Sequence, residues 1–260
     1  MLSFFRSLLF GLFLAITVIP WATAALLMSV FVRGERLYWW CAAWLRLAVI
    51  GARWICGVRY RLHGAENLRL AEQAQAVVLL PKHQSTWETF AFPFLMPRPL
   101  SYVFKRELLQ IPFFGWAMAR LDMIHIDRSK RTEAWNKVEQ QGKHFMAHGN
   151  WVIMFPEGTR VARGEQGQYK SGGTRLAIHA GASVLPVAVT SARCWPRKSF
   201  VLRPGVIDVC VGPLIPSSGR QPNDLMREVE TWIETEMRRL DPDAYPAAAT
   251  VSGLQVESMP

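Results

Sequence analysis

His83 and Glu88 lie five positions apart, shortly after the apolar stretch Ala76–Leu80. An unperturbed imidazole has a pKa of about 6.5, which suits a general base at neutral pH. A carboxylate bound to the other ring nitrogen fixes the tautomer and stabilises the imidazolium, as in a hydrolase dyad. The pair therefore predicts proton abstraction from a substrate hydroxyl.

The same residues also fit a structural pattern. Ser85-Thr86-Trp87-Glu88 is a capping box, with Ser85 as the N-cap of a helix and Glu88 in its first turn. Helix capping alone would account for Glu88 without any chemistry. Ser85 is interpreted as a cap rather than a nucleophile, because no Gly-x-Ser-x-Gly turn surrounds it.

A second cluster with charged residues, Phe155–Arg160, follows the apolar stretch Trp151–Met154. Gly158 allows the backbone to approach a ligand closely, and the planar guanidinium of Arg160 suits phosphate. Glu157 can hold a hydroxyl or orient the arginine. An ordinary turn with a weak surface pair between Glu157 and Arg160 is the alternative interpretation.

Further basic residues follow predicted strands or precede a predicted helix. Lys105 and Arg106 precede the apolar turn Leu108–Trp116, which fits a phosphate clamp beside an acyl-chain wall or a solvated strand end before a core helix. Arg128 can add a cation at the same edge. Lys170 stands before glycines whose amides suit an anion near a helix start. Each of these signals is nonspecific by itself.

Alternating strands and helices are expected after Arg59 to position these clusters. The expected strands are Ala76–Leu80, Tyr102–Phe104, Met123–Ile126, Trp151–Phe155, Val184–Val189 and Val206–Val211. The expected helices are Thr86–Phe94, Leu108–Arg120, Thr132–His148, Gly173–Ala180 and Asn223–Leu240. This pattern favours an α/β fold with a mixed central sheet flanked by helices. Residues 59–240 are expected to form the catalytic domain, and residues 241–260 a flexible tail rich in Pro and Ala.

Residues 1–58 are expected to anchor the protein to a membrane. Ser7–Val32 carries no charged residue, and as a helix it would measure about 39 Å, against about 30 Å for the apolar core of a bilayer. Pro20 allows a kink or a re-entrant shape. A cleaved signal peptide is the less favoured interpretation, because the apolar run is too long.

The next segment, Leu37–Cys56, predicts an amphipathic helix at the membrane interface. Its Arg46 and Arg53 lie on one helical face among several tryptophans. Trp and Arg suit the headgroup zone, whereas Arg in the apolar core is costly, which disfavours a second spanning helix. Arg33 and Arg36 favour a cytoplasmic position for the chain that follows the first segment.

The composition limits the kinds of partner that the chain can bind. The formal charge is +10, and half of the residues are hydrophobic, with a mean hydropathy of +0.09. Such a chain fits an anionic membrane surface or nucleic acid, and no helix-turn-helix, zinc-finger or RNP-like sequence supports nucleic acid. The cysteines form neither a CxxC pair nor a zinc pattern, which fits reduced, buried side chains. They are Cys41, Cys56, Cys194 and Cys210.

The order of the polar clusters resembles the lysophospholipid acyltransferase family. His83-x4-Glu88 is similar to its His-x4-Asp block, Lys105–Gly115 to its basic block with leucine, proline and glycine, and Val184–Val187 to its apolar-proline block. Phe155–Arg160 matches the third block without change and is the most specific part. The resemblance covers roughly Arg59–Gly212. Glu88 stands where the family has Asp and extends the carboxylate by about 1.5 Å.

The resemblance implies the fold of glycerol-phosphate acyltransferases and acyl transfer from acyl-CoA or acyl-carrier protein to the 2-hydroxyl of lysophosphatidate. The product would be phosphatidate, made for phospholipid biosynthesis at the inner membrane with the catalytic domain on the cytoplasmic side. His83 would be the general base, oriented by Glu88, while Glu157 and Gly158 would shape the glycerol pocket. The implied ligands of the acceptor's phosphate are Lys105, Arg106, Arg128 and Arg160.

No cofactor, metal or acyl-enzyme is implied, since no activated Ser or Cys and no metal-ligand spacing is present. Two alternatives stay open. One is another acceptor, such as glycerol 3-phosphate or a different lysolipid. The other is a non-catalytic basic protein that binds membranes.

Overall fold

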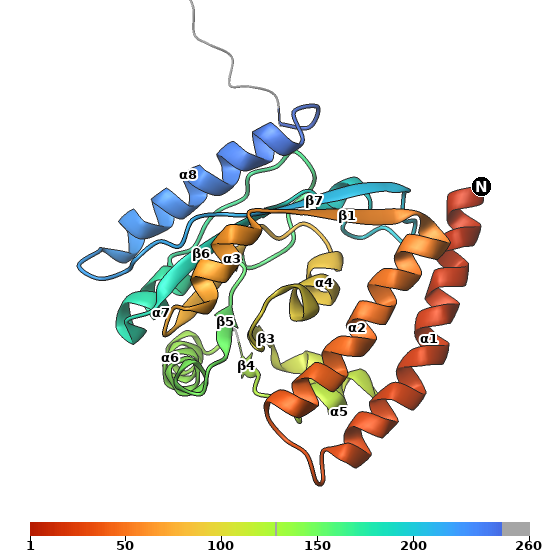
Figure 1. Ribbon diagram of the computed structural model, residues 1–260, viewed down its shortest axis with the longest axis horizontal. Coiled ribbons are helices and arrows are strands. Elements are labelled where there is room, and N and C mark those ends of the chain that lie inside the picture. Colours follow the sequence, from red (N-terminus) through yellow and green to blue (C-terminus); the bar gives the residue numbers. More distant parts are fainter. Residues whose placement is uncertain (128, 246–260) are drawn as a thin grey trace, which may run out of the picture.

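Seven strands form one sheet in residues 1–127 and 129–245, the part of the chain that the computed structural model describes (Figure 1). The order across the sheet is β1 (Val58–His63), β7 (Gly205–Val211), β6 (Ser183–Val189), β2 (Val77–Pro81), β5 (Trp151–Ile153), β3 (Leu100–Lys105) and β4 (Ile124–Ile126). β6 and β7 are antiparallel, and the other neighbouring pairs are parallel. The mixed central sheet predicted from the sequence is confirmed.

The strand directions bring the sequence clusters to one edge. β6, β2, β5, β3 and β4 run the same way, so their carboxyl ends meet on the same side of the sheet. Ligands of open α/β sheets bind outside such carboxyl ends. His83 follows β2, Glu157 follows β5, and Lys105 ends β3.

Helices cover both faces of the sheet. One core packs against α1 (Leu2–Met28), α2 (Glu35–Cys56), α3 (Ala65–Glu72) and α4 (Trp87–Leu95), and the other against α6 (Arg131–Ala147), α7 (Gly172–Ala180) and α8 (Pro222–Leu240). β2 serves both cores, because Val77 and Leu79 belong to the first and Val78 and Leu80 to the second. This double burial explains why β2 is an unbroken apolar run.

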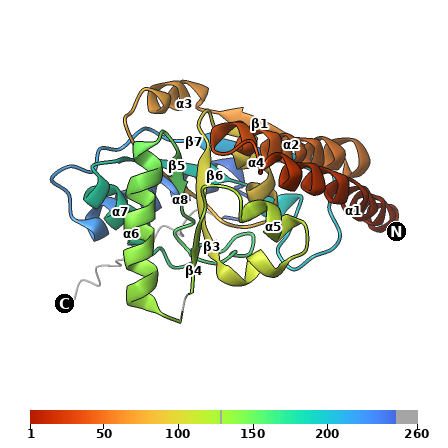
Figure 2. The same cartoon turned by 90° about the horizontal axis from the view of Figure 1, so that it is seen from below.

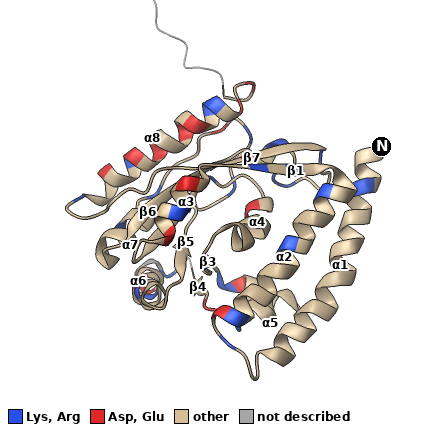
Figure 3. Cartoon of the chain, in the orientation of Figure 1, with Lys and Arg blue, Asp and Glu red and all other residues tan. Residues whose placement is uncertain are grey.

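Helices α1 and α2 lie side by side at one end of the molecule (Figures 1 and 2). α1 is long and apolar enough to cross a membrane, and Pro20 lies within this single helix. Figure 3 shows few charged residues along α1, whereas acidic and basic residues are frequent on α8. Two indole nitrogens join the pair: Trp44 Nε1 donates to Thr17 Oγ1 at 3.1 Å and Trp21 Nε1 to the carbonyl oxygen of Trp40 at 3.0 Å. Membrane anchoring by these helices stays a prediction.

The structure differs from the expected elements in three places. Strand β1 and helix α3 were not expected. The helix expected over Leu108–Arg120 is divided into a 3-10 turn, Arg106–Gln110, and α5, Phe114–Met118. Pro112 lies between the two parts and disfavours helical geometry in the residue before it.

The third difference is at the C-terminal end. Asp241 and Tyr245 are buried, and Asp241 accepts two hydrogen bonds from the guanidinium of Arg163, at 2.7 and 2.6 Å. The prediction of a flexible tail from residue 241 is therefore wrong for residues 241–245. The rest of the expected tail, residues 246–260, lies outside the described residues.

We expect Leu79→Ala to lower the free energy of unfolding by about 2–5 kcal/mol, because Leu79 is fully buried between the sheet and the first helical layer. Leu70→Ala is the matched control: Leu70 is 58% exposed, and its loss should change stability by about 0.5 kcal/mol or less. Denaturant unfolding in detergent measures both. Equal effects of the two substitutions would contradict the double-layer core.

Candidate active site

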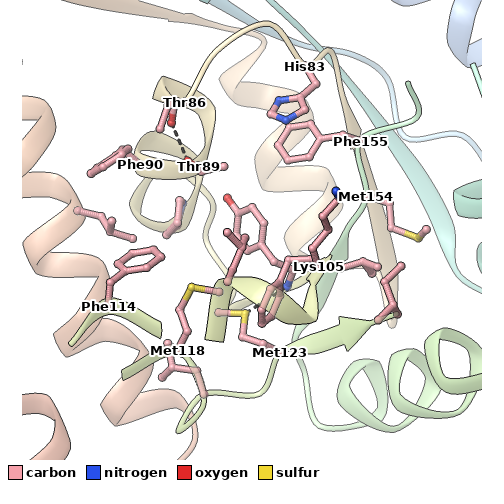
Figure 4. Close-up of a pocket in the computed structure, with 18 of the residues that line it drawn as sticks. His83, Thr86, Thr89, Phe90, Lys105, Phe114, Met118, Met123, Met154 and Phe155 are labelled. Atoms are coloured by element: carbon pink, nitrogen blue, oxygen red, sulfur yellow. Dashed lines mark hydrogen bonds between the residues drawn. The ribbon is translucent and has the colours of Figure 1, made fainter. Parts of the chain in front are cut away.

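The backbone of His83 is held by the loop that follows the neighbouring strand. Its N–H donates to Glu157 Oε1 at 3.2 Å, and its carbonyl oxygen accepts from the N–H of Val161 at 2.8 Å. The imidazole also stacks on the ring of Phe155, with centroids 3.7 Å apart and planes 19° apart (Figure 4). The third sequence block thus holds His83 from the side of β5.

His83 and Glu88 form the expected pair. His83 Nδ1 lies 2.9 Å from Glu88 Oε2, and Glu88 is fully buried. A buried carboxylate favours a proton on Nδ1, which leaves Nε2 to accept a proton from a substrate. The histidine side chain is 13% exposed, so a ligand can reach it.

Glu88 also performs the capping role that was the alternative interpretation. Its oxygens accept from the N–H of Ser85 at 3.0 and 2.9 Å and from the N–H of Gln84 at 3.2 Å. The N-cap of α4 is Thr86, one residue later than expected. The hydroxyl of Ser191 is a further donor to Glu88. Sequence reasoning missed Ser191, because it lies 103 positions away and no local motif marks it.

A cavity of about 990 Å³ begins beside His83 and reaches α1 and α2. This volume is at the upper end of the range for small-molecule sites, about 300–1,000 Å³. Figure 4 shows His83 and Phe155 at one end of the drawn residues and Met118 and Met123 at the other. The wall of the cavity includes apolar side chains from four helices: Val18 and Ala22 of α1, Ala42 and Leu45 of α2, Phe90 of α4 and Val138 of α6. Such a wall suits a long hydrocarbon chain.

Among the described residues, three cations line the cavity together with His83: Lys105, Arg160 and Lys170. Arg160 Nη1 donates to Thr86 Oγ1 at 2.6 Å, which joins the third block to the start of α4. Gly158 also lines the cavity and has a φ of 68°. A Cβ at this position would lie 3.2 Å from Lys170 Nζ, so glycine leaves room for the ammonium. This group of cations suits an anionic substituent on a ligand.

The other sequence candidates lie elsewhere. Arg106 lines a separate, smaller cavity, so the expectation that it joins Lys105 at one phosphate does not hold in this structure. Glu157 is buried and does not line the main cavity, so it shapes no pocket wall there. Its carboxylate instead positions His83 from behind. Arg128 lies outside the described residues.

A buried ion cluster lies behind His83. Lys82 is fully buried, and its Nζ donates to Glu234 Oε1 at 2.5 Å and to the carbonyl oxygens of Glu165 and Gln166 at 3.1 and 2.7 Å. Glu157 Oε1 lies 3.7 Å from the same Nζ. Breaking a buried pair is costly, so α8 fixes the residue next to the histidine. Sequence reasoning missed Lys82, although it continues the buried face of Val78 and Leu80.

No group of three or more His, Cys, Asp or Glu side chains suited to a metal ion occurs among the described residues.

Comparisons with known proteins identify the family of the chain. Residues 59–190 match the acyltransferase family model. The 1-acyl-sn-glycerol-3-phosphate acyltransferase of Pseudomonas aeruginosa is 38% identical over 241 residues, which cover 91% of this chain and 92% of that protein. The human 1-acyl-sn-glycerol-3-phosphate acyltransferase alpha is 27% identical over 70% of this chain and 63% of its own length.

The fold has a solved counterpart. The crystal structure of the 1-acyl-sn-glycerophosphate acyltransferase from Thermotoga maritima has a TM-score of 0.76 and 20% sequence identity, covering 91% of this chain and 95% of that chain. This likeness shows the fold, and the family model and the relative from Pseudomonas aeruginosa show that the protein is an acyltransferase. It belongs to the acyltransferase family, as the four sequence blocks predicted.

The pH dependence of stability tests the environment of Glu157. Burial raises the pKa of its carboxyl to about 7, although Lys82 and backbone N–H groups oppose the shift. Because the folded-state pKa exceeds that of the unfolded chain, protonation contributes stability fully below pH about 4.5, and this is lost as pH rises through about 7.

Glu157→Gln should remove this contribution, which amounts to roughly 3 kcal/mol over that interval. Denaturant unfolding from pH 4.5 to 8 measures the difference in slope between the variant and the wild type. Glu133→Gln is the exposed control and should keep the wild-type slope. A wild-type slope in Glu157→Gln would contradict the raised pKa.

Proposed function

We propose that this enzyme transfers a fatty acyl chain from a thioester donor to the 2-hydroxyl of lysophosphatidate, giving phosphatidate. The observation that carries the proposal is the position of His83, held by Glu88, beside both an apolar cavity and three cations. The names of the relatives from Pseudomonas aeruginosa and human support the acceptor, since both are 1-acyl-sn-glycerol-3-phosphate acyltransferases.

The reaction needs one base and a site for the chain. His83 Nε2 takes the proton of the acceptor's hydroxyl as its oxygen attacks the thioester carbonyl carbon. The new C–O bond forms, the C–S bond breaks, and the imidazolium returns its proton to the leaving thiolate. Glu88 keeps Nδ1 protonated and stabilises the imidazolium during attack.

The three cations take the phosphate of the acceptor in this proposal. Arg160 offers a planar pair of donors, and Lys105 and Lys170 add charge. Holding the phosphate places the glycerol hydroxyl near His83. Such positioning of two reacting groups lowers the activation free energy by an amount on the order of 7–11 kcal/mol when they are well oriented. The fatty chains occupy the apolar wall between the helices.

The donor is acyl-CoA or acyl-carrier protein, and the acceptor and product are lipids of the bilayer. We propose that α1 anchors the protein in the inner membrane and that α2 lies at the interface, where its exposed Arg46 and Arg53 meet anionic lipid. The catalytic part then lies on the cytoplasmic side, and the product enters phospholipid biosynthesis.

His83→Ala should lower kcat by about 10²–10⁴-fold, because the general base is lost. The assay uses purified protein in mixed micelles with labelled acyl-CoA and lysophosphatidate. His144→Ala, at an exposed position on α6, is the control and should keep wild-type turnover. Unchanged kcat in His83→Ala would rule out His83 as the general base. If the wild type were inactive with lysophosphatidate but active with glycerol 3-phosphate, glycerol 3-phosphate would be the acceptor instead.

Arg160→Ala should raise KM for lysophosphatidate by about tenfold and leave KM for the acyl donor within about twofold, because one charged hydrogen-bonding group is lost. Steady-state kinetics with each substrate varied in turn measure both constants. Arg69→Ala, on the exposed side of α3, is the matched control. Equal changes in the two constants would argue against a phosphate contact of Arg160.

A further inference from the structure

A second cavity, of about 180 Å³, lies next to the main one. Ile126 at the end of β4 and Ala134 on α6 line both cavities, so the two cavities adjoin at these residues. Arg106, His125, Lys130 and Lys137 supply its basic groups. Nothing in the mechanism proposed above uses this cavity.

Positive charge in the second cavity is only partly neutralised. Among the residues that the structure describes, no carboxylate lies within ion-pair distance of Arg106 or Lys137. Lys137 Nζ instead lies 2.8 Å from His125 Nε2, and the imidazole must be neutral there to accept its proton. Partial burial and the neighbouring Arg106 lower the pKa of Lys137, as expected for like charges held together.

Two carboxylates, Asp127 and Glu133, also line this cavity. Asp127 accepts from the N–H and the hydroxyl of Ser129 at 3.0 and 2.6 Å. Glu133 pairs with Lys130 at 3.1 Å. Ser129 is neutral and leaves the negative charge of Asp127 in place, and Arg106 helps to lower the pKa of that carboxyl. Three cations, Arg106, Lys130 and Lys137, against two carboxylates leave the cavity with a formal surplus of one positive charge. The cavity therefore suits an anion of phosphate size.

The position of the cavity favours a water-soluble ligand over a bilayer lipid. It is formed by β4, α6 and the turn after β3, and both views place α6 far from α1 and α2 (Figures 1 and 2). It nevertheless adjoins the catalytic edge, because Lys105 pairs in register with Ile126. The second cavity thus borders the main cavity on the side of β4 and α6.

We propose that the second cavity binds phosphate on the pantetheine arm of the thioester donor, an inference that rests on the function proposed above. In the proposed function, Lys105, Arg160 and Lys170 bind the acceptor's phosphate. The donor must place its thioester at His83 and its chain in the apolar cavity, so its charged portion has to leave that cavity. Arg106 and Lys137 offer the next cationic group along this edge.

Phosphate on such an arm has two sources, coenzyme A and the phosphopantetheine of a carrier protein. The test therefore compares three donors with the same acyl chain: acyl-CoA, acyl-carrier protein, and S-acyl-N-acetylcysteamine, which has no phosphate. The variants are Arg106→Gln and Lys137→Gln. Arg106→Lys retains charge, and Lys143→Gln, on an exposed part of α6, is the matched control.

Each neutralising variant should lower kcat/KM by about tenfold for at least one phosphate-bearing donor, through KM. Turnover with S-acyl-N-acetylcysteamine and KM for lysophosphatidate should stay within about twofold, which also shows that the variants fold. Arg106→Lys should recover most of the loss. The donor that loses activity identifies the source of the phosphate.

An equal loss with the phosphate-free donor, a raised KM for lysophosphatidate, or unchanged constants with both phosphate-bearing donors would overturn the inference. Failure of the proposed function gives a different result, since the wild type itself would then transfer no acyl chain to lysophosphatidate from any donor.

Discussion

The site depends on one buried carboxylate. Glu88 is fully buried, and an ionised group in such a place requires several donors. It receives them from the backbone of Gln84 and Ser85, from the hydroxyl of Ser191 and from the ring of His83. Since these donors come from the loop after β2 and the segment after β6, satisfying the carboxylate fixes the imidazole and joins two strand ends.

The remaining supports of His83 act from the opposite side. Phe155 stacks on the ring, Glu157 accepts from its backbone, and Lys82 ties the preceding residue to α8. With Nδ1 held by Glu88 and the ring fixed, Nε2 remains for a ligand. The wall of the cavity contains apolar side chains of α1 and α2, and it also contains His83 and the cations Lys105, Arg160 and Lys170. An alcohol, an anion and a hydrocarbon chain can meet there.

Much of this could be predicted from local sequence. His83 and Glu88 lie five positions apart just after a buried strand, and the third block directly follows another, so their places along the chain bring them to the sheet edge. Strand β1 was missed because its exposed Arg59, Tyr60 and Arg61 give no apolar alternation. Pairing across the sheet with β7 supplies its stability instead.

Contacts between distant segments could not be predicted from local sequence. Glu234 and Ser191 reach the site from α8 and from the end of β6, and no spacing rule connects them to His83. The separation of Lys105 and Arg106 is of the same kind: Lys105 ends β3, whereas Arg106 begins a 3-10 turn that the sequence did not predict, and the two residues line different cavities.

The most direct measurement is a crystal structure of the protein with lysophosphatidate and a non-reactive thioether analogue of the acyl donor. We predict that the acceptor's 2-hydroxyl oxygen lies about 2.6–3.2 Å from His83 Nε2 while Nδ1 stays on Glu88. A ternary complex in which that hydroxyl binds beyond hydrogen-bond reach of the imidazole, with the donor's carbonyl position occupied, would contradict the account.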